Sequence, residues 1–475
     1  MKIIIVGCSR VGETLATQLR AEGNNITIID LNPEKINALT AKLDIMGIVG
    51  NGATNSTLKE AGIDSTDLLI AVTDSDELNL LCCMIAKKND KCRVIARVTN
   101  PEYSTEASYL KDELGLEMII NPELESAGEI ARVLRFPSAL KVETFAKGKV
   151  ELITFRLPEE CPLIGMAARE IATKLKCGVL VCAVERSGDA YIPNGDFVFE
   201  EGDVISVVVS SKKISDFFEK IDLKVSSAKD ATIVGAGRLT HYLCDMLEGS
   251  GIAVKVIDKD LEACEELSTK FDWVTVINGD GTDHEVLTEE GIARTDAFLA
   301  LAKHDEENIL LSLFVKNEHA AKVITKINRP ENYDIVKHLC LDTTIYPKSV
   351  TADIIVRYVR ATKNTLGSNI EAMYSIVKDT VEASEFIVGN DSPVTNVPLS
   401  QLEFKKDILV AAIIRKRTVI IPRGVDVMLP GDSVVIVSKK TALHDIADVL
   451  VDTLTAADEL PPPTKNKRTA KVNKK

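Results

Sequence analysis

Two short stretches of this sequence carry residues suited to binding the phosphates of a nucleotide. Each is an apolar run, residues 3–6 or 231–234, that leads into a glycine turn. The two turns read Gly7-Cys8-Ser9-Arg10-Val11 and Gly235-Ala236-Gly237-Arg238-Leu239. Glycine lets backbone N–H groups approach a pyrophosphate, and the dipole of a helix that begins there favours an anion. We therefore interpret the residues of both turns as candidate nucleotide contacts.

An aspartate follows each turn at the same distance. Asp30 and Asp258 both stand 23 positions after the first glycine, at the end of the expected second strand. A carboxylate at this place can accept hydrogen bonds from the two ribose hydroxyls, and it would repel the 2′-phosphate of NADP. We predict a ribose contact for each; the alternative is a plain carboxylate at a strand end.

An arginine occupies the fourth position of each turn. Arg10 and Arg238 fall in the first turn of the expected helix, where a cation opposes the helix dipole. A nearby phosphate reverses the sign of that interaction. We favour an anion contact over an exposed side chain that points away, and the phosphate could belong to the same or to a neighbouring subunit.

Further candidates follow the later strands, because the carboxyl ends of parallel strands meet at one crevice. Asn51 and Asp280 follow the third strands, near the expected adenine, although a simple turn explains them nearly as well. Thr73 and Asp74 end the fourth strand of the first half. Arg97, like its counterpart Lys326, stands on the fifth strand, where it would reach distal phosphates or form a surface salt bridge.

The two turns also depart from the dinucleotide fingerprint, each in its own way. Ser9 replaces the second glycine in the first half, which crowds the backbone or offers a hydroxyl. Thr240 replaces the last glycine in the second half, so we expect strand and helix to stand further apart there. Different ligands or affinities for the two halves follow from these departures.

The elements that position these residues alternate between strand and helix, which predicts a doubly wound parallel sheet. A β-rich segment with Pro-x-Gly turns follows, and then the order starts again. Gly7 and Gly235 are 235 − 7 = 228 positions apart, and the later landmarks keep nearly the same offset. The sequence thus predicts a tandem duplication. Its expected parts are nucleotide-binding domains at 1–120 and 229–345, connecting helices at 121–143 and 346–366, β-rich modules at 144–224 and 367–455, and a Pro/Lys-rich tail at 456–475.

Composition narrows the class of protein further. The chain has 475 residues, 45% of them hydrophobic, with a net charge of −14, which argues against nucleic acid as a partner. No stretch approaches the roughly 20 apolar residues that span a bilayer. We expect a cytoplasmic protein with reduced, mostly buried cysteines and no metal site, because no two Cys or His have ligand spacing.

Together, the duplicated turns, the aspartates and the β-rich modules resemble the TrkA family of Trk-type potassium uptake regulatory proteins, whose halves are tandem RCK units. The resemblance covers roughly residues 1–455. It implies nucleotide contacts at Gly7 to Val11, Asp30, Thr73, Asp74 and Arg97, and at Gly235 to Leu239, Asp258 and Asp280 in the second half. It also implies binding of NAD(H) or ATP/ADP, and a cytoplasmic RCK ring at the inner face of the membrane, under a membrane-embedded potassium transporter subunit.

The alternative reading is an NAD-dependent oxidoreductase, the commonest use of such a turn. Hydride transfer needs a substrate domain and a placed acid or base. The β-rich segments show no His-Asp, Ser-Lys or Cys-His constellation typical of a catalytic site, and the first half contains no histidine. The sequence therefore favours a nucleotide-responsive regulator over an enzyme.

Overall fold

The computed structural model describes residues 1–451 except 90, 137, 147–148, 176–177, 211–212, 224–227, 319–321, 330–331, 333–335, 337, 340, 365–369, 378–379, 417, 440–442 and 444. The predicted tail at 456–475, Cys177 and Cys340 lie outside the described residues. The remaining eight cysteines are free and buried, as expected of reduced core thiols.

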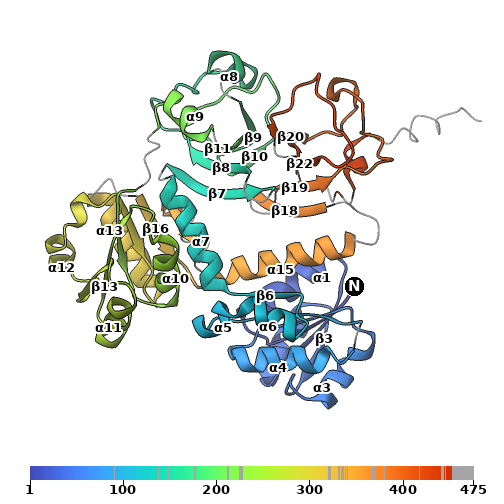
Figure 1. Cartoon of the computed structure of the whole chain (residues 1–475), viewed down its shortest axis with the longest axis vertical. Coiled ribbons are helices and arrows are strands. Elements are labelled where there is room, and N and C mark those ends of the chain that lie inside the picture. Colours follow the sequence, from blue (N-terminus) through green and yellow to red (C-terminus); the bar gives the residue numbers. More distant parts are fainter. Residues whose placement is uncertain are drawn as a thin grey trace, which may run out of the picture.

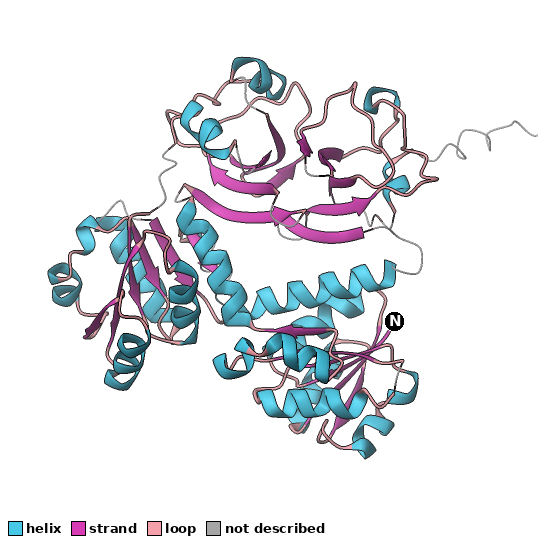
Figure 2. Cartoon of the chain, in the orientation of Figure 1, coloured by secondary structure: helices cyan, strands magenta, loops and turns pink. Residues whose placement is uncertain are grey.

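The first nucleotide-binding domain is a six-stranded sheet with helices on both faces (Figures 1 and 2). Its strand order, β3-β2-β1-β4-β5-β6, is entirely parallel and is the doubly wound order. The residues of β1 from Ile3 to Val6 are at most 2% exposed, which explains their unbroken apolar run. The elements are β1 Lys2–Val6, α1 Arg10–Ala21, β2 Asn25–Asp30, α2 Pro33–Lys42, β3 Met46–Val49, α3 Asn55–Glu60, η1 Ile63–Ser65, β4 Leu68–Ala71, α4 Asp76–Ala86, β5 Arg93–Arg97, α5 Pro101–Thr105, α6 Ala107–Glu113 and β6 Met118–Ile120.

The second nucleotide-binding domain repeats this topology. Its parallel sheet has the order β14-β13-β12-β15-β16-β17. The elements are β12 Asp230–Val234, α10 Arg238–Leu247, β13 Ala253–Asp258, α11 Leu261–Lys270, β14 Thr275–Asn278, α12 His284–Glu289, η2 Ile292–Arg294, β15 Ala297–Ala300, α13 Asp305–Glu318, β16 Lys322–Lys326 and β17 Thr343–Ile345. The predicted duplication of an α/β domain is confirmed.

Each β-rich module is an antiparallel five-stranded sheet with one strand order in both copies, β10-β9-β11-β8-β7 and β21-β20-β22-β19-β18. One face of each sheet packs against the helices and loops of its own module. The opposite faces of the two sheets form a shared core that includes Phe145, Val208, Ala383 and Val437. The elements are β7 Ala139–Phe145, β8 Val150–Arg156, α8 Ala168–Lys174, β9 Val179–Arg186, β10 Asp189–Tyr191, β11 Val204–Ser210 and α9 Ile214–Lys220, then β18 Ile370–Val377, β19 Val381–Ile387, η4 Leu399–Gln401, β20 Ile408–Arg415, β21 Thr418–Ile420, β22 Ser433–Lys439 and η5 Ile446–Val449.

One long helix connects each nucleotide-binding domain to the β-rich module that follows it. These helices are α7, Pro122–Arg135, and α15, Pro347–Asn364. The segment 121–143 was predicted to be a connecting helix, but helix occupies it only as far as Arg135 and β7 begins at Ala139. The reason is local: Phe136 precedes a proline in the sequence and has φ −134°, outside the helical region that such a residue disfavours.

The connecting helices exchange partners between the halves (Figure 1). The apolar face of α7, with Ile130 and Val133, is part of the second domain's core and packs beside Leu243 of α10. Conversely, α15 buries Ile355 and Val359 against Leu15 and its neighbours on α1 of the first domain. Each half therefore completes the core of the other.

A buried lysine also joins the second domain to the first module. Lys322 is 9% exposed, and its Nζ donates to the carbonyl of Ala139 at 2.6 Å. Beside it, the Thr343 hydroxyl donates to the carbonyl of Leu140 at 3.2 Å. Burial lowers the pKa of Lys322 to about 8, with nearby Asp342 opposing the shift and Lys316 adding to it.

This lowered pKa predicts a pH dependence of stability. The folded chain releases the Lys322 proton near pH 8 and the unfolded chain only near its ordinary value of about 10.4, so between these values the unfolded state binds more protons and stability rises with pH. We expect wild type to gain about 2 kcal/mol over Lys322→Met between about pH 8 and pH 10, measured by urea unfolding. Lys406→Met, an exposed lysine in the second module, is the control. Equal slopes for wild type and Lys322→Met would refute this.

Candidate functional site

Both glycine turns lie at the carboxyl edge of their sheets, against the end of the neighbouring strand. Gly7 has φ +107° and Gly235 has φ +114°, in the region that favours glycine. A Cβ on Gly7 would lie 2.9 Å from the backbone nitrogen of Thr73, and one on Gly235 would lie 2.8 Å from the carbonyl carbon of Leu301. The two first glycines are thus required by conformation and by space.

Asp30 and Asp258 hold these turns in the same way. In each half one carboxylate oxygen accepts a backbone N–H of the turn at 2.6 Å, from Cys8 or from Ala236. The other oxygen accepts the backbone N–H two residues on, at 2.8 or 2.9 Å. A carboxylate offers about four acceptor positions, so each aspartate keeps capacity for ribose hydroxyls.

The side chains of the turns divide into accessible and buried ones. Val11 and Leu239, both proposed as nucleotide contacts, are 3% and 4% exposed and belong to the domain cores. Their side chains face the sheets because they lie on the inner faces of α1 and α10, so only their backbones can approach a ligand. Cys8 is also buried, which raises the pKa of its thiol, with Asp30 adding to the shift.

The departures at Ser9 and Thr240 have structural explanations. Ser9 does not crowd the turn, because its hydroxyl donates to the carbonyl of Val72 at 3.1 Å, and a Cβ at the equivalent Gly237 would meet open space. In the first half a Cβ on Gly12 would lie only 1.9 Å from the carbonyl oxygen of Gly7. Thr240 fills that position in the second half, and its hydroxyl donates to the carbonyl of Gly235 at 2.5 Å.

The two arginines differ in their surroundings. Arg238 donates from Nη1 to the hydroxyl of Thr99 at 3.0 Å, and Thr99 follows β5 of the first domain. Tyr242, one turn further along α10, donates to the carbonyl of Thr99 at 3.3 Å and accepts from Asn121 at 2.8 Å. The helix that begins at the second turn therefore docks on the carboxyl edge of the first sheet. Arg10 is exposed at the start of α1.

This contact between the domains is what sequence reasoning missed. Asn121 follows β6, and its amide also donates to Ser104 at 2.7 Å. The buried Asp76 fixes the loop by accepting the backbone N–H groups of Thr99 and Asn100 at 2.9 and 2.7 Å. No local pattern marks these residues, because the contact joins positions more than 100 residues apart.

Asn51 and Asp280 form turns and lie close to the ends of the first strands. Asn51 accepts the backbone N–H of Ala53 at 2.9 Å, and Asp280 accepts the N–H and hydroxyl of Thr282 at 2.9 and 2.7 Å. These hydrogen bonds, first the one from the hydroxyl, lower the pKa of Asp280. Both side chains thus have the turn role that was the alternative, and both are exposed.

Thr73, Asp74 and Arg97 do converge in the first half. The Thr73 hydroxyl donates to Oδ1 of Asn79 at 2.7 Å, and Nη1 of Arg97 lies 3.6 Å from a carboxylate oxygen of Asp74. The Arg97 side chain is 18% exposed and Asp74 is 90% exposed. The sequence left a distal phosphate contact and a salt bridge open for Arg97, and the structure contains the salt bridge.

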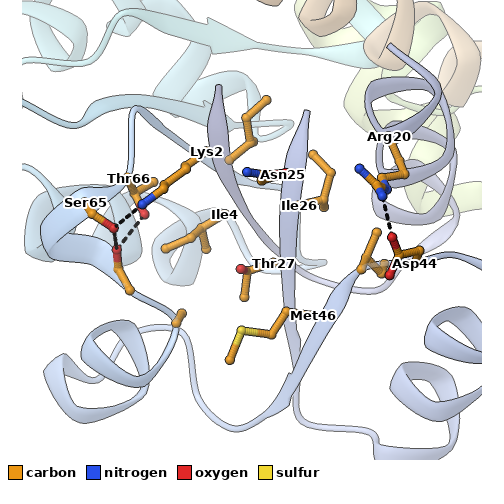
Figure 3. A pocket seen from close by; sticks show the side chains of 14 residues that line it. Lys2, Ile4, Arg20, Asn25, Ile26, Thr27, Asp44, Met46, Ser65 and Thr66 are labelled. Atoms are coloured by element: carbon orange, nitrogen blue, oxygen red, sulfur yellow. Dashed lines mark hydrogen bonds and ion pairs between the residues drawn. The ribbon is translucent and has the colours of Figure 1, made fainter. Parts of the chain in front are cut away.

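Two cavities lie on the first domain. One, of about 470 Å³, is open and lined by Asp30 to Glu34, beside the glycine turn. The other, of about 410 Å³, lies at the opposite, amino edge of the sheet, between Lys2, Thr27, Met46 and Ser65 (Figure 3). In the second domain the position of Thr27 is Lys255, which pairs with Glu290 at 2.9 Å.

Neither a metal centre nor a membrane span is found in the described part of the chain. No group of three or more His, Cys, Asp or Glu side chains there could hold a metal ion. Among the same residues, no helix combines the length and the hydropathy needed to cross a bilayer.

The geometry, two Rossmann-like nucleotide crevices each joined to a small β-rich module, defines a tandem RCK architecture, and comparison with known proteins agrees. Residues 3–122 and 231–347 match the TrkA-N domain family, and residues 152–222 and 383–451 match the TrkA-C domain family. The chain belongs to the TrkA family of Trk system potassium uptake proteins.

Curated relatives match over almost their whole length. The Trk system potassium uptake protein TrkA homolog 1 of Methanosarcina mazei is 32% identical over 94% of this chain and 99% of its own. The TrkA homolog of Archaeoglobus fulgidus is 32% identical over 94% of this chain and 100% of its own. The TrkA protein of Halomonas elongata is 30% identical over 94% and 98%.

Solved structures share the fold at low sequence identity. The GsuK RCK domain matches with a TM-score of 0.62 and 17% identity, covering 92% of both chains. The GsuK channel bound to NAD matches with the same TM-score and 16% identity, covering 92% of this chain and 77% of that chain.

Proposed function

We propose that this chain is the cytoplasmic, nucleotide-binding regulatory subunit of a Trk-type potassium uptake transporter and that it is not an enzyme. In this proposal it binds NAD(H), ATP or ADP at its two crevices and associates with a membrane-embedded potassium transporter subunit. The observation that carries it is the pair of glycine turns, each closed by an aspartate that keeps capacity for ribose. The contacts of the crevices are those assigned above, with Val11 and Leu239 contributing backbone only.

The contact between the two nucleotide-binding domains supports a way for nucleotide binding to change the conformation of the chain. A nucleotide in the first crevice lies beside the edge on which Arg238 and Tyr242 dock, and α7 and α15 carry any rearrangement to the β-rich modules. Such a ligand shifts the conformation only if it binds one arrangement more tightly than the other. A hundredfold preference corresponds to about 2.7 kcal/mol.

Turnover separates this proposal from the oxidoreductase alternative. We expect the purified chain, mixed with NADH and a panel of carbonyl and quinone oxidants, to show no sustained loss of the 340 nm absorbance. The median turnover number of enzymes is roughly 10 per second, and any NADH oxidation by this chain should be at least about tenfold slower. Sustained turnover that disappears in Asp30→Ala or Asp258→Ala would overturn the regulatory reading. Enzyme-free mixtures provide the baseline.

We further propose that chains associate into a ring through α4 and α13. Leu81 on α4 and Leu310 on α13 stand at equivalent positions of the two halves, and they are 45% and 68% exposed. Met84, one turn after Leu81, is 48% exposed. Because the duplication repeats this apolar position, each chain carries two similar surfaces, as a closed ring of repeated contacts requires.

Light scattering tests this assembly. We expect Leu81→Glu with Leu310→Glu to weaken association at least about tenfold, because a charge would be buried at each contact. The control is Leu261→Glu, a leucine on α11 that is 57% exposed. The ring proposal fails if the double variant keeps the mass of wild type, or if wild type has the mass of one chain at all concentrations.

A further inference from the structure

The two crevices differ most in the loop that follows the fourth strand. This loop reads Thr73-Asp74-Ser75 after β4 and Ala302-Lys303-His304 after β15. In both halves it lies directly against the glycine turn, since a Cβ on the first glycine would be 2.9 Å from the backbone nitrogen of Thr73 or of Ala302. A nucleotide whose pyrophosphate occupies the turn extends its distal part over this loop.

Hydrogen bonding to the loop also differs between the halves. The amide nitrogen of Asn79 bridges the carbonyls of Thr73 and Arg97 at 3.1 and 2.9 Å, and its oxygen accepts the N–H and hydroxyl of Thr73 at 2.8 and 2.7 Å. Asn308 keeps the amide bridge, at 3.0 Å to Ala302 and to Lys326. Its buried oxygen, however, has no hydrogen-bond partner among the described residues. The first loop is closed by its own hydroxyl, whereas the second lacks that donor.

The charges at the two loops have opposite signs. In the first crevice the exposed carboxylate of Asp74 stands beside Arg97 at 3.6 Å and offsets its charge. In the second, the exposed Lys303 takes the place of Asp74. Lys326 replaces Arg97 and donates to the carbonyl of Leu301 at 2.6 Å, with Asp305 and Glu123 facing it. Exchange of Asp74 for Lys303 alone changes the loop by two elementary charges.

We propose that the first crevice takes the dinucleotide NAD(H) and the second takes ATP or ADP, an assignment that rests on the proposed function. The two ligand classes share adenosine and the first two phosphates. Beyond them NAD continues into an uncharged ribose, whose hydroxyls can donate to Asp74, whereas ATP ends in a phosphate that Asp74 repels. At the second crevice Lys303 attracts that phosphate and offers no acceptor to a second ribose.

Binding measured by calorimetry on the full chain tests the assignment. Asp258→Ala leaves only the first crevice intact, and Asp30→Ala leaves only the second. We expect the ratio of the ATP to the NAD dissociation constant to be at least about tenfold higher in Asp258→Ala than in Asp30→Ala. In the wild-type background, Lys303→Asp should weaken ATP binding by about tenfold and change NAD binding much less.

The control is Lys406→Asp, an equal charge change on an exposed residue of the second β-rich module. Lys303 is exposed, so its exchange keeps the test valid even if an aspartate variant fails to fold. Equal or reversed ratios in the two single-crevice variants, or unchanged ATP binding in Lys303→Asp, overturn the assignment but leave the proposed function standing. Absence of binding of both nucleotides to wild type overturns the proposed function itself.

Discussion

Replacing Ile130 by alanine should destabilise the half of the chain to which it does not belong. Ile130 is fully buried on α7, in the first half of the sequence, and its core neighbours include Ile233, Leu239 and Leu243 of the second domain. Truncating a buried isoleucine to alanine costs about 2–5 kcal/mol. Hydrogen exchange should therefore speed up in residues 231–300 and stay near wild type in residues 3–97.

The reciprocal change gives the matched experiment. Ile355 on α15 is equally buried, against Leu15 and Leu19 of the first domain. Ile355→Ala should raise exchange in residues 3–97 by a comparable free energy, about 2–5 kcal/mol, and spare residues 231–300. Glu125→Ala, an exposed position on α7, should leave both domains unchanged. If each alanine loosens only the domain of its own half, the exchange of helices is not how the chain is held together.

The sequence was sufficient for the sheets and for the residues at their carboxyl edge. Apolar runs, glycine turns and an aspartate at a fixed distance are local features. Asp30 and Asp258 accordingly close their turns with identical geometry, at 2.6 Å in both halves. The constant offset between the halves added the duplication, because two copies of one pattern require two copies of one fold.

The contacts between the two halves of the chain could not be predicted from the sequence. The periodicity of α7 shows that Ile130 faces a core, but it does not show which domain supplies that core. Arg238 likewise belongs to a local motif, while its partner Thr99 lies in the other half of the chain. For Ser9 the sequence left a crowded backbone and an offered hydroxyl both open, because the rotamer that directs the hydroxyl to the carbonyl of Val72 depends on the adjacent strand.

Removing the turn aspartates should abolish most of the stabilisation that nucleotides provide. A ligand at one hundred times its dissociation constant adds about 2.7 kcal/mol to the stability of the folded state. Asp30→Ala and Asp258→Ala each remove the ribose acceptor of one crevice. They also remove the hydrogen bonds from Cys8 or Ala236, so we expect each ligand-free variant to lose about 1–3 kcal/mol by itself.

Comparing each variant with and without ligand separates the two effects. The stability that a variant loses without ligand measures the hydrogen bonds that close the turn. The decrease in the additional stability provided by the nucleotide measures the ribose contact. Asp283→Ala serves as the control, because this aspartate caps α12 by accepting from Glu285 at 2.9 Å and belongs to neither turn. Its ligand-dependent increment should equal that of wild type.

The most direct test of a nucleotide-sensing role is therefore a thermal-unfolding series of wild type, Asp30→Ala and Asp258→Ala with NAD, NADH, ATP and ADP. We predict that at least one of these nucleotides raises the melting temperature of wild type and loses most of that effect in one of the two variants. No shift of wild type with any of the four, or an undiminished shift in both variants, would contradict the proposal that these two turns hold a nucleotide.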